Sequence, residues 1–295
     1  MPPLAHFGKH LNVSNLYKRV DEESENCTMT EKVRHILSLS GGKDSAALAI
    51  YMRDRVSEME YIFHDTEKEL PETYEYLSRL EAFLGKKIHH TKPDYSFDKW
   101  YDIYGEIIPS GYRRWCTRML KLKPFEAYVG DDAVINYVGI RADEEREGYI
   151  SHKSNIKAVF PFREDGLVKA DIIRILEDSG LGLPTFTQWG RTRSGCFFCF
   201  YQQKIEWVRL KEKHPDLYED AKQYEKPNKI NGNVFFWSGD ESLEAIEQPG
   251  RMAEIKRNWE KTVEQRRKNS NKLVHILTDL EDETEEREGC LICQL

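Results

Sequence analysis

The most constraining feature of this sequence is a glycine turn between a strand and a helix. Residues 33–39 read as a buried strand, Ser40-Gly41-Gly42-Lys43-Asp44-Ser45 follows it, and an apolar helix continues over 46–51. Adjacent glycines let the backbone approach a phosphate chain, and the N–H groups and positive dipole end of the helix face that anion. The segment therefore predicts a nucleotide-binding turn.

Strands continue to alternate with helices after this turn. We expect strands at 60–64, 87–91 and 133–139, and helices at 70–84 and 168–179, the last one closed by Gly180. Alternation of this kind predicts an α/β fold in which a mostly parallel sheet carries helices on both faces.

The composition becomes helical and charged after Cys199. We expect helices at 204–213 and 215–224 and one long charged helix from 243 to about 277, followed by an acidic run at 279–288. This pattern divides the chain into an arm at 1–30, a nucleotide-binding catalytic domain at 31–200, a helical region at 201–278 and an acidic tail at 279–295.

Charge and hydropathy argue against two classes of protein. The formal net charge of -7 is unsuited to a protein that coats nucleic acid by bulk electrostatics. No stretch approaches the roughly twenty apolar residues of a membrane span, and the first residues lack a signal-peptide pattern. We therefore expect a cytoplasmic protein that makes no membrane contact.

One segment is basic although the chain is acidic. Five basic residues stand within eleven positions without one acid, namely Arg113, Arg114, Arg118, Lys121 and Lys123. Such a patch suits a nucleotide or a nucleic-acid backbone. A solvated helix face is the alternative interpretation.

Four of the six cysteines form two C-x-x-C pairs, Cys196 with Cys199 and Cys290 with Cys293. In a chain without an export signal, this pattern favours metal ligation or redox chemistry over disulfides. Thiolates suit zinc and iron–sulfur clusters, but one pair is not a complete site. In the alternative interpretation, the pair is a free dithiol and Cys116 is an ordinary buried cysteine.

The glycine turn resembles the PP-loop of ATP pyrophosphatases, which split ATP between its α and β phosphates and attach AMP to an oxygen of the substrate. Four further segments extend the resemblance in order: Asp65-Thr66 before Leu70-Pro71-Glu72-Thr73, Arg114-Trp115-Cys116-Thr117 with Lys121, Gly139-Ile140-Arg141-Ala142-Asp143-Glu144, and Gly195-Cys196-Phe197-Phe198-Cys199. The set resembles the phosphoadenosine phosphosulfate (PAPS) reductase superfamily, and within it the DNA phosphorothioation branch. It implies a Rossmann-like fold of the adenine nucleotide alpha hydrolase type.

The complete loop bears on the substrate. Sulfonucleotide reductases usually lack the full Gly-Gly-Lys-Asp-Ser run, so its presence implies ATP. In this resemblance Lys43 neutralises the β and γ phosphates and Asp44 helps to hold Mg²⁺, which makes these two the candidate catalytic residues of the loop. The implied nucleotide-binding set is Ser40, Gly41, Gly42, Lys43, Asp44, Ser45, Asp65 and Arg141.

The same resemblance assigns Cys116, Cys196 and Cys199 to one centre, a 4Fe-4S cluster with zinc as the alternative. The fourth position stays open. It is filled by a cysteine of the tail, for which Cys293 is our candidate, or by Cys27, or it carries a sulfide. Cys290 loosely resembles the mobile carboxy-terminal nucleophile of sulfonucleotide reductases, and an exposed dithiol without catalytic duty is the alternative.

Three functions are consistent with this pattern. In the first, ATP adenylates an acceptor such as nucleic acid, and sulfur from a cysteine desulfurase or another donor displaces AMP. In the second, the chain is a PAPS or adenylyl sulfate reductase with Cys290 as the nucleophile. In the third, it is a nucleotide-binding accessory subunit of a nucleoprotein defence complex. We expect a homodimer or a subunit of a larger complex.

Overall fold

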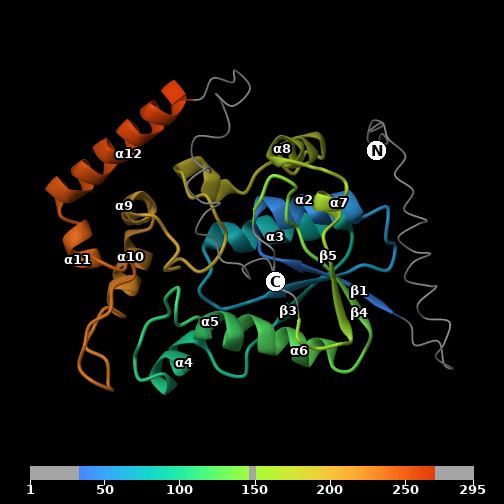
Figure 1. The fold of residues 1–295 in the computed structure, drawn as a ribbon, viewed down its shortest axis with the longest axis horizontal. Coiled ribbons are helices and arrows are strands. Elements are labelled where there is room, and N and C mark those ends of the chain that lie inside the picture. Colours follow the sequence, from blue (N-terminus) through green and yellow to red (C-terminus); the bar gives the residue numbers. More distant parts are fainter. Residues whose placement is uncertain (1–32, 146–150, 270–295) are drawn as a thin grey trace.

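The computed structural model describes residues 33–145 and 151–269. These residues form a sheet of five parallel strands in the order β3-β2-β1-β4-β5 (Figure 1). The strands are β1 (Arg34–Leu39), β2 (Glu60–His64), β3 (Ile88–Thr91), β4 (Val134–Tyr137) and β5 (Ile156–Val159).

Helices cover both faces of this sheet. Figure 1 shows α2, α3 and α8 on one face and α6 on the other. The helical elements are α2 (Lys43–Met52), α3 (Pro71–Leu84), α4 (Phe97–Ile103), α5 (Trp115–Thr117), the π turn η1 (Arg118–Leu122), α6 (Lys123–Val129), α7 (Pro161–Glu164), α8 (Lys169–Asp178), the 3₁₀ turn η2 (Thr185–Trp189), α9 (Lys204–Lys213), α10 (Pro215–Lys222), α11 (Leu243–Ile246) and α12 (Pro249–Asn269). Within the described ranges, no helix combines the length and the apolar character that crossing a membrane requires.

The strands are apolar on both sides because both sides are covered. Leu37 and Leu39 of β1 join a core with residues of α2, α3 and α8, whereas Ile36 packs into a second core with Phe125 and Val129 of α6. Successive strand residues point to opposite faces, so one apolar run supplies both cores.

A third core joins the carboxy-terminal helices to the segments that carry cysteines. It contains Phe97 of α4, Trp115 of α5, Phe198 and Trp237. The ring of Phe198 stacks on Trp237 at a centroid distance of 4.8 Å and lies 4.5 Å from Phe97. This core spans both sides of the boundary expected at residue 200, and the division into domains stays a prediction.

The predicted α/β fold, with a parallel sheet between two helical layers, is confirmed. The single long helix expected from residue 243 was wrong, because α11 ends at Ile246 and α12 begins at Pro249. Proline has no N–H to continue a helix and is favoured in the first turn of a new one. Residues 270–277 of that expected helix, the arm at 1–30 and the tail at 279–295 lie outside the described residues.

His64 generates a prediction about stability. This residue at the end of β2 is buried, its Nδ1 lies 2.7 Å from Thr91 Oγ1, and its Nε2 has no partner among the described residues. Burial lowers the pKa of His64 from 6.5 to about 3, so the folded state holds the neutral ring. An unfolded histidine takes up a proton below about pH 6.5. The stability tied to the neutral ring is therefore lost as the pH falls from about 6.5 toward 3.

Denaturant titrations of the wild type and of His64→Gln between pH 7.5 and 4.5 measure this loss. We expect the free energy of unfolding of the wild type to fall more steeply with acid, by up to about 1.4 kcal/mol per pH unit. Equal slopes for the two proteins would contradict the assignment.

Candidate functional site

The glycine turn lies at the point where the sheet changes direction. It joins the carboxyl end of β1 to α2, with β2 and β3 on one side of β1 and β4 and β5 on the other. Open α/β sheets bind ligands outside the carboxyl ends of their strands at such a switch point. The loop at 40–45 therefore occupies the position at which this fold accepts a nucleotide.

Three glycines around this loop have little room for a side chain. Gly41 has a φ of +72°, and a Cβ placed on it would lie 2.5 Å from Cγ2 of Thr73. A Cβ on Gly42 would lie 2.8 Å from Ser194 Oγ, and one on Gly139 would lie 3.1 Å from the carbonyl oxygen of Asp44. Glycine suits these positions because neighbouring protein atoms already occupy the space that a side chain would take.

Two hydroxyls hold the loop in shape. Ser45 Oγ accepts from the Ser40 N–H at 3.2 Å and donates to the Gly42 carbonyl at 3.2 Å. Ser40 Oγ lies 3.1 Å from Ser45 Oγ. The loop that the sequence identified is thus ordered by its own serines, before α2 begins at Lys43.

Arg141 is buried among carboxylates. Its Nη1 lies 3.0 Å from Asp44 Oδ1 and 3.2 Å from Glu144 Oε1, and its Nε lies 2.9 Å from Asp143 Oδ1. These pairs fasten the segment after β4 to the first turn of α2. A phosphate contact for Arg141, and Mg²⁺ ligation by Asp44, stay predictions. Lys43 Nζ lies 4.0 Å from Asp44 Oδ2.

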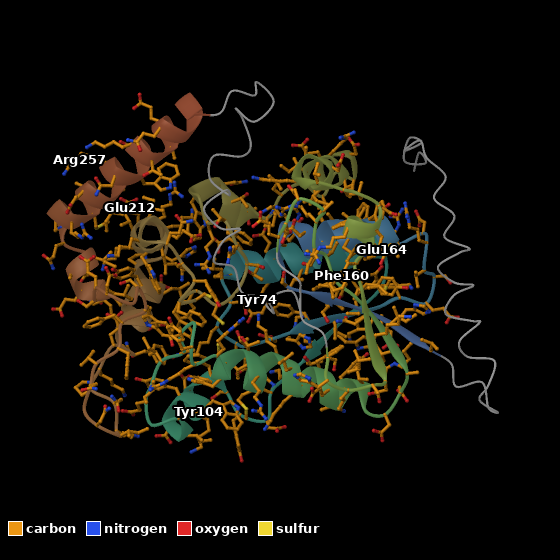
Figure 2. The ribbon with its side chains drawn as sticks, in the orientation of Figure 1. Tyr74, Tyr104, Phe160, Glu164, Glu212 and Arg257 are labelled. Atoms are coloured by element: carbon orange, nitrogen blue, oxygen red, sulfur yellow. The ribbon has the colours of Figure 1, made fainter. Side chains whose placement is uncertain are left out.

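Asp65 follows β2 at the same edge of the sheet. Its Oδ1 accepts from the Tyr74 hydroxyl at 2.7 Å and from the Glu67 N–H at 2.9 Å. Burial and the hydrogen bond to Asp65 raise the pKa of Tyr74, whose side chain lies near the centre of the molecule in Figure 2. Asp65 is thus held in place by α3 and by its own loop.

The structure brings three cysteines into one electrostatic neighbourhood. Cys116 on α5, Cys196 and Cys199 are free thiols, each partly exposed although protein atoms surround it closely. Burial raises the pKa of Cys116 to about 11 and that of Cys196 well above its usual value. Cys199 adds to both shifts, and Lys121 opposes both. Metal ligation by these thiols stays a prediction.

The described residues gather no three His, Cys, Asp or Glu side chains closely enough to hold a single metal ion. The remaining candidates for this centre are Cys27, Cys290 and Cys293, which lie outside the described residues.

Sequence analysis missed Glu69, which contacts the turn at residues 195–199 that carries the C-x-x-C pair. We call this segment the cysteine turn. Its Oε1 accepts from Thr66 Oγ1 at 2.9 Å and lies 3.9 Å from Cys196 Sγ, while Thr66 Oγ1 lies 3.2 Å from the same sulfur. Glu69 also pairs with Cys196 through a backbone bridge, and burial raises the pKa of its carboxyl group. The available signal was an acid inside the stretch between Asp65-Thr66 and Pro71.

Sequence analysis also missed Arg191, which is buried and donates hydrogen bonds to the backbone of the cysteine turn. It is only 2% exposed and donates to the carbonyls of Arg193, Gly195 and Cys196 at 3.0, 3.3 and 2.9 Å. It also donates to Gln202 Oε1 at 2.6 Å. No local spacing distinguishes this arginine from a surface one, so only the fold reveals its role.

The π turn η1 explains why Lys121 acts on the thiols. A π turn closes its hydrogen bond over five residues instead of four, as Lys123 N–H does to the Arg118 carbonyl. Residues five apart, such as Cys116 and Lys121, therefore come closer to one face of the helix. Of the basic patch, Lys121 thus lies in the cysteine neighbourhood, and π turns are frequent at functional sites.

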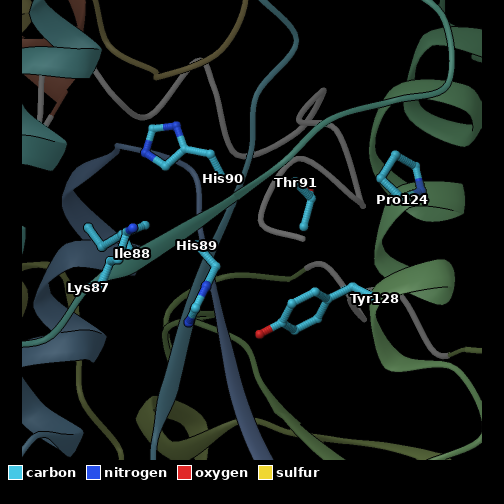
Figure 3. Close-up of a pocket in the computed structure, with 7 residues that line it drawn as sticks. All are labelled: Lys87, Ile88, His89, His90, Thr91, Pro124 and Tyr128. Atoms are coloured by element: carbon cyan, nitrogen blue, oxygen red, sulfur yellow. The ribbon is translucent and has the colours of Figure 1, made fainter.

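A hollow of about 570 Å³ opens at the edge of the sheet between β3 and α6 (Figure 3). Its lining consists of Lys87, Ile88, His89, His90, Thr91, Pro124 and Tyr128. The ring of His90 points away from Pro124 and Tyr128 (Figure 3), and its Nδ1 lies 3.6 Å from Asp65 Oδ2. The hollow therefore opens on the side of the edge strand that faces α6.

Comparison with known proteins finds similarity in the part of the chain that carries the glycine loop. Residues 34–163 match the family model of the phosphoadenosine phosphosulfate reductase domain. Two uncharacterised proteins of Methanocaldococcus jannaschii are 27% identical over 205 residues and 24% identical over 192 residues, which cover 64% and 61% of this chain. An adenosine 5'-phosphosulfate reductase of Staphylococcus haemolyticus is 27% identical over 110 residues, or 37% of this chain. The matches span 41%, 45% and 45% of these relatives, which is less than half of each.

Two solved structures are similar at low identity. The phosphoadenylyl-sulfate reductase of Candida auris in its phosphate complex is 15% identical with a TM-score of 0.46, over 63% of this chain and 89% of that chain. The U34-tRNA thiolase NcsA of Methanococcus maripaludis with its 4Fe-4S cluster is 12% identical with a TM-score of 0.38, over 75% of this chain and 84% of that chain.

The contact between Gly41 and Thr73 predicts that a side chain at position 41 has two costs, one from the backbone conformation and one from the clash with Thr73. Gly41→Ala places a Cβ both at a positive φ and 2.5 Å from Thr73 Cγ2. We expect a loss of about 1–2 kcal/mol from the backbone conformation alone, and a further loss from the clash. Thr73→Ser removes Cγ2, so Gly41→Ala should cost less in that background. Equal costs in the two backgrounds, measured by urea unfolding, would contradict the contact.

Proposed function

Because the chain belongs to the PAPS reductase superfamily through its domain at residues 34–163, we propose that it is an ATP-dependent enzyme of sulfur transfer. In this proposal ATP adenylates an oxygen of an acceptor, with nucleic acid as our candidate. A sulfur nucleophile then displaces AMP beside a cysteine-bound iron–sulfur cluster.

The ordered glycine loop at the switch point is the observation that carries this proposal. Gly41 and Gly42 let the loop turn tightly against Thr73 and Ser194 and lead directly into α2, so no side chain stands at either position in front of the helix. The first N–H groups of α2 and the ammonium of Lys43 supply positive charge there. A triphosphate chain with Mg²⁺ matches that charge.

The reaction balances without a redox step. The acceptor oxygen attacks the α phosphorus of ATP, the bond to the β phosphate oxygen breaks, and pyrophosphate leaves. A donor at the oxidation level of sulfide then attacks the activated atom, and AMP leaves with the oxygen. A persulfide from a cysteine desulfurase would supply this donor after a thiol reductant has released its outer sulfur as sulfide and a disulfide has formed. The role of this chain is to hold the phosphates at 40–45 and to bring the acceptor to the thiols, as expected for catalysis by positioning and charge.

Three thiols in one neighbourhood have the soft donor chemistry of an iron–sulfur cluster. We favour an iron–sulfur cluster over one zinc ion because of the family resemblance of the cysteine segments, and zinc stays the alternative. Cys116, Cys196 and Cys199 would hold it, and when bound it would carry sulfur or electrons.

The match to an adenosine 5'-phosphosulfate reductase favours one alternative, a reductase that acts on a sulfonucleotide. In such an enzyme Cys290 would attack the sulfur of PAPS or adenylyl sulfate and release the nucleotide, and a second thiol as reductant would then release sulfite and form a disulfide. It would not release pyrophosphate from ATP. Assays of sulfite and of pyrophosphate on the same preparation separate the two functions.

For the nucleotide site we expect Lys43→Ala to weaken ATP binding at least tenfold and to abolish pyrophosphate release, because one charge next to the phosphates is lost. Calorimetry with ATP and Mg²⁺ measures the affinity. Lys157→Ala, an exposed lysine on β5, is the matched control and should bind ATP normally. Unchanged affinity in Lys43→Ala would refute the ATP site.

For the cluster we expect anaerobically purified protein to contain iron and acid-labile sulfide. Cys196→Ser should remove most of both, because it deletes a central thiolate, whereas Cys27→Ser should retain them. Elemental analysis and visible absorption provide the measurement. Stoichiometric zinc without iron, or a metal-free protein, would contradict this assignment.

A further inference from the structure

Exposed apolar side chains concentrate on one part of the surface. Of the seven large hydrophobic residues that the described ranges expose, all but Val168 lie in two segments: Tyr95, Ile103, Tyr104 and Tyr112 in the first, and Ile230 and Val234 in the second. We call this surface the aromatic face. The segments adjoin, because the Lys229 N–H donates to the Gly105 carbonyl at 2.8 Å and Ile230 packs against Gly105. Concentrated apolar exposure of this kind marks an interaction surface.

The rings of the aromatic face form a ladder that leads toward the cysteines. Tyr95 lies 5.4 Å from Trp100, Trp100 lies 6.0 Å from Tyr104, and Tyr104 stacks on Trp115 at 5.2 Å with an interplanar angle of 12°. Trp115 directly precedes Cys116. Figure 2 shows Tyr104 on α4 at the periphery of the molecule. The ladder therefore connects solvent with the segment that carries the first thiol.

Two exposed cations border these rings. Arg113 lies over Phe235 at 5.5 Å and Lys123 lies over Trp100 at 5.7 Å, and neither meets a carboxylate among the described residues. Tyr112, next to Arg113, is 102% exposed.

Three of the nearby acids, in contrast, are neutralised, whereas Asp94 beside Tyr95 has no ion pair among the described residues. Asp98 pairs with Lys68 at 2.9 Å, and Lys229 reaches Asp102 at 2.6 Å and Glu106 at 3.1 Å. The aromatic face therefore keeps positive charge in a chain whose net charge is -7.

We propose that the aromatic face binds an unpaired stretch of nucleic acid, whose bases stack on the rings while its phosphates meet Arg113 and Lys123. This inference rests on the proposed function and specifies its acceptor as single-stranded or looped out. Duplex bases are already stacked on each other and would leave the rings unused. An apolar protein partner would leave the two cations without counter-charge. Rings with bordering cations are the usual combination in single-strand binding.

Fluorescence anisotropy with the full chain tests this assignment directly. The probes are a labelled oligonucleotide of about 16 nucleotides, as DNA and as RNA, and the same sequence as a duplex. We expect both single strands to bind more tightly than the duplexes. Tyr112→Ala should weaken single-strand binding roughly 5- to 150-fold, and its full exposure makes misfolding an unsuitable explanation.

Two further variants separate stacking from other effects. Tyr112→Phe keeps the ring and should bind like the wild type, and Val168→Ala, at the exposed apolar residue outside the aromatic face, should also bind normally. Arg113→Gln combined with Lys123→Gln should lower affinity and flatten the dependence of log affinity on log salt by about 0.7 per charge removed.

Several outcomes would overturn the proposal. They are unchanged single-strand affinity in Tyr112→Ala, duplex binding as tight as single-strand binding, or no binding of either form. The last outcome would reassign the aromatic face to a protein partner. The assay needs neither ATP nor a cluster, so single-strand binding that survives alongside a failed ATP test would refute the proposed function and leave this inference standing.

Discussion

A short backbone junction between the loop after β2 and the cysteine turn holds the site together. The Phe197 N–H donates to the Lys68 carbonyl at 2.8 Å, and Glu69 bridges Cys196 at the next position. Phe198 continues from this junction into the aromatic core. The position of the thiols relative to the nucleotide loop therefore depends on two chain segments that lie more than a hundred residues apart in the sequence. It also depends on the carboxy-terminal helices, which pack against the cysteine turn.

Much of the fold was predictable because its signals are local. The strand at 60–64 and the helices α3 and α9 follow from apolar runs, Pro71 and the glycine after α3, all of which act within a few residues. The glycine loop was recognisable for the same reason, since its serines bond to each other inside one turn. The closeness of Cys116 to the C-x-x-C turn followed only from the ordered resemblance, because no local rule connects residues eighty positions apart.

The residues that sequence analysis missed act over distance. Glu69 contacts Cys196, which lies 127 positions further along the chain. Arg191 is buried, and no periodic pattern in the sequence indicates that burial. The strand β5 is only four residues long, which is too short for an alternating pattern to stand out. Arg141 combines both cases: its place after a strand suggests a phosphate contact, which stays a prediction, whereas the three carboxylates around its guanidinium are visible only in the structure.

The π turn between α5 and α6 accommodates one residue more than a regular helix would place between the Cys116 thiol and the Lys121 ammonium. An α-helix rotates by about 100° per residue, so in a regular helix five residues would set these two side chains about 140° apart around the axis. The five-residue hydrogen bond of the π turn reduces that rotation. A relative that lacked one residue of 118–120 would space the cysteine and the lysine four apart, and a regular helix keeps residues four apart on one face. An alignment gap at this point would therefore preserve the pair, whereas a change that made the helix regular without a deletion would separate it.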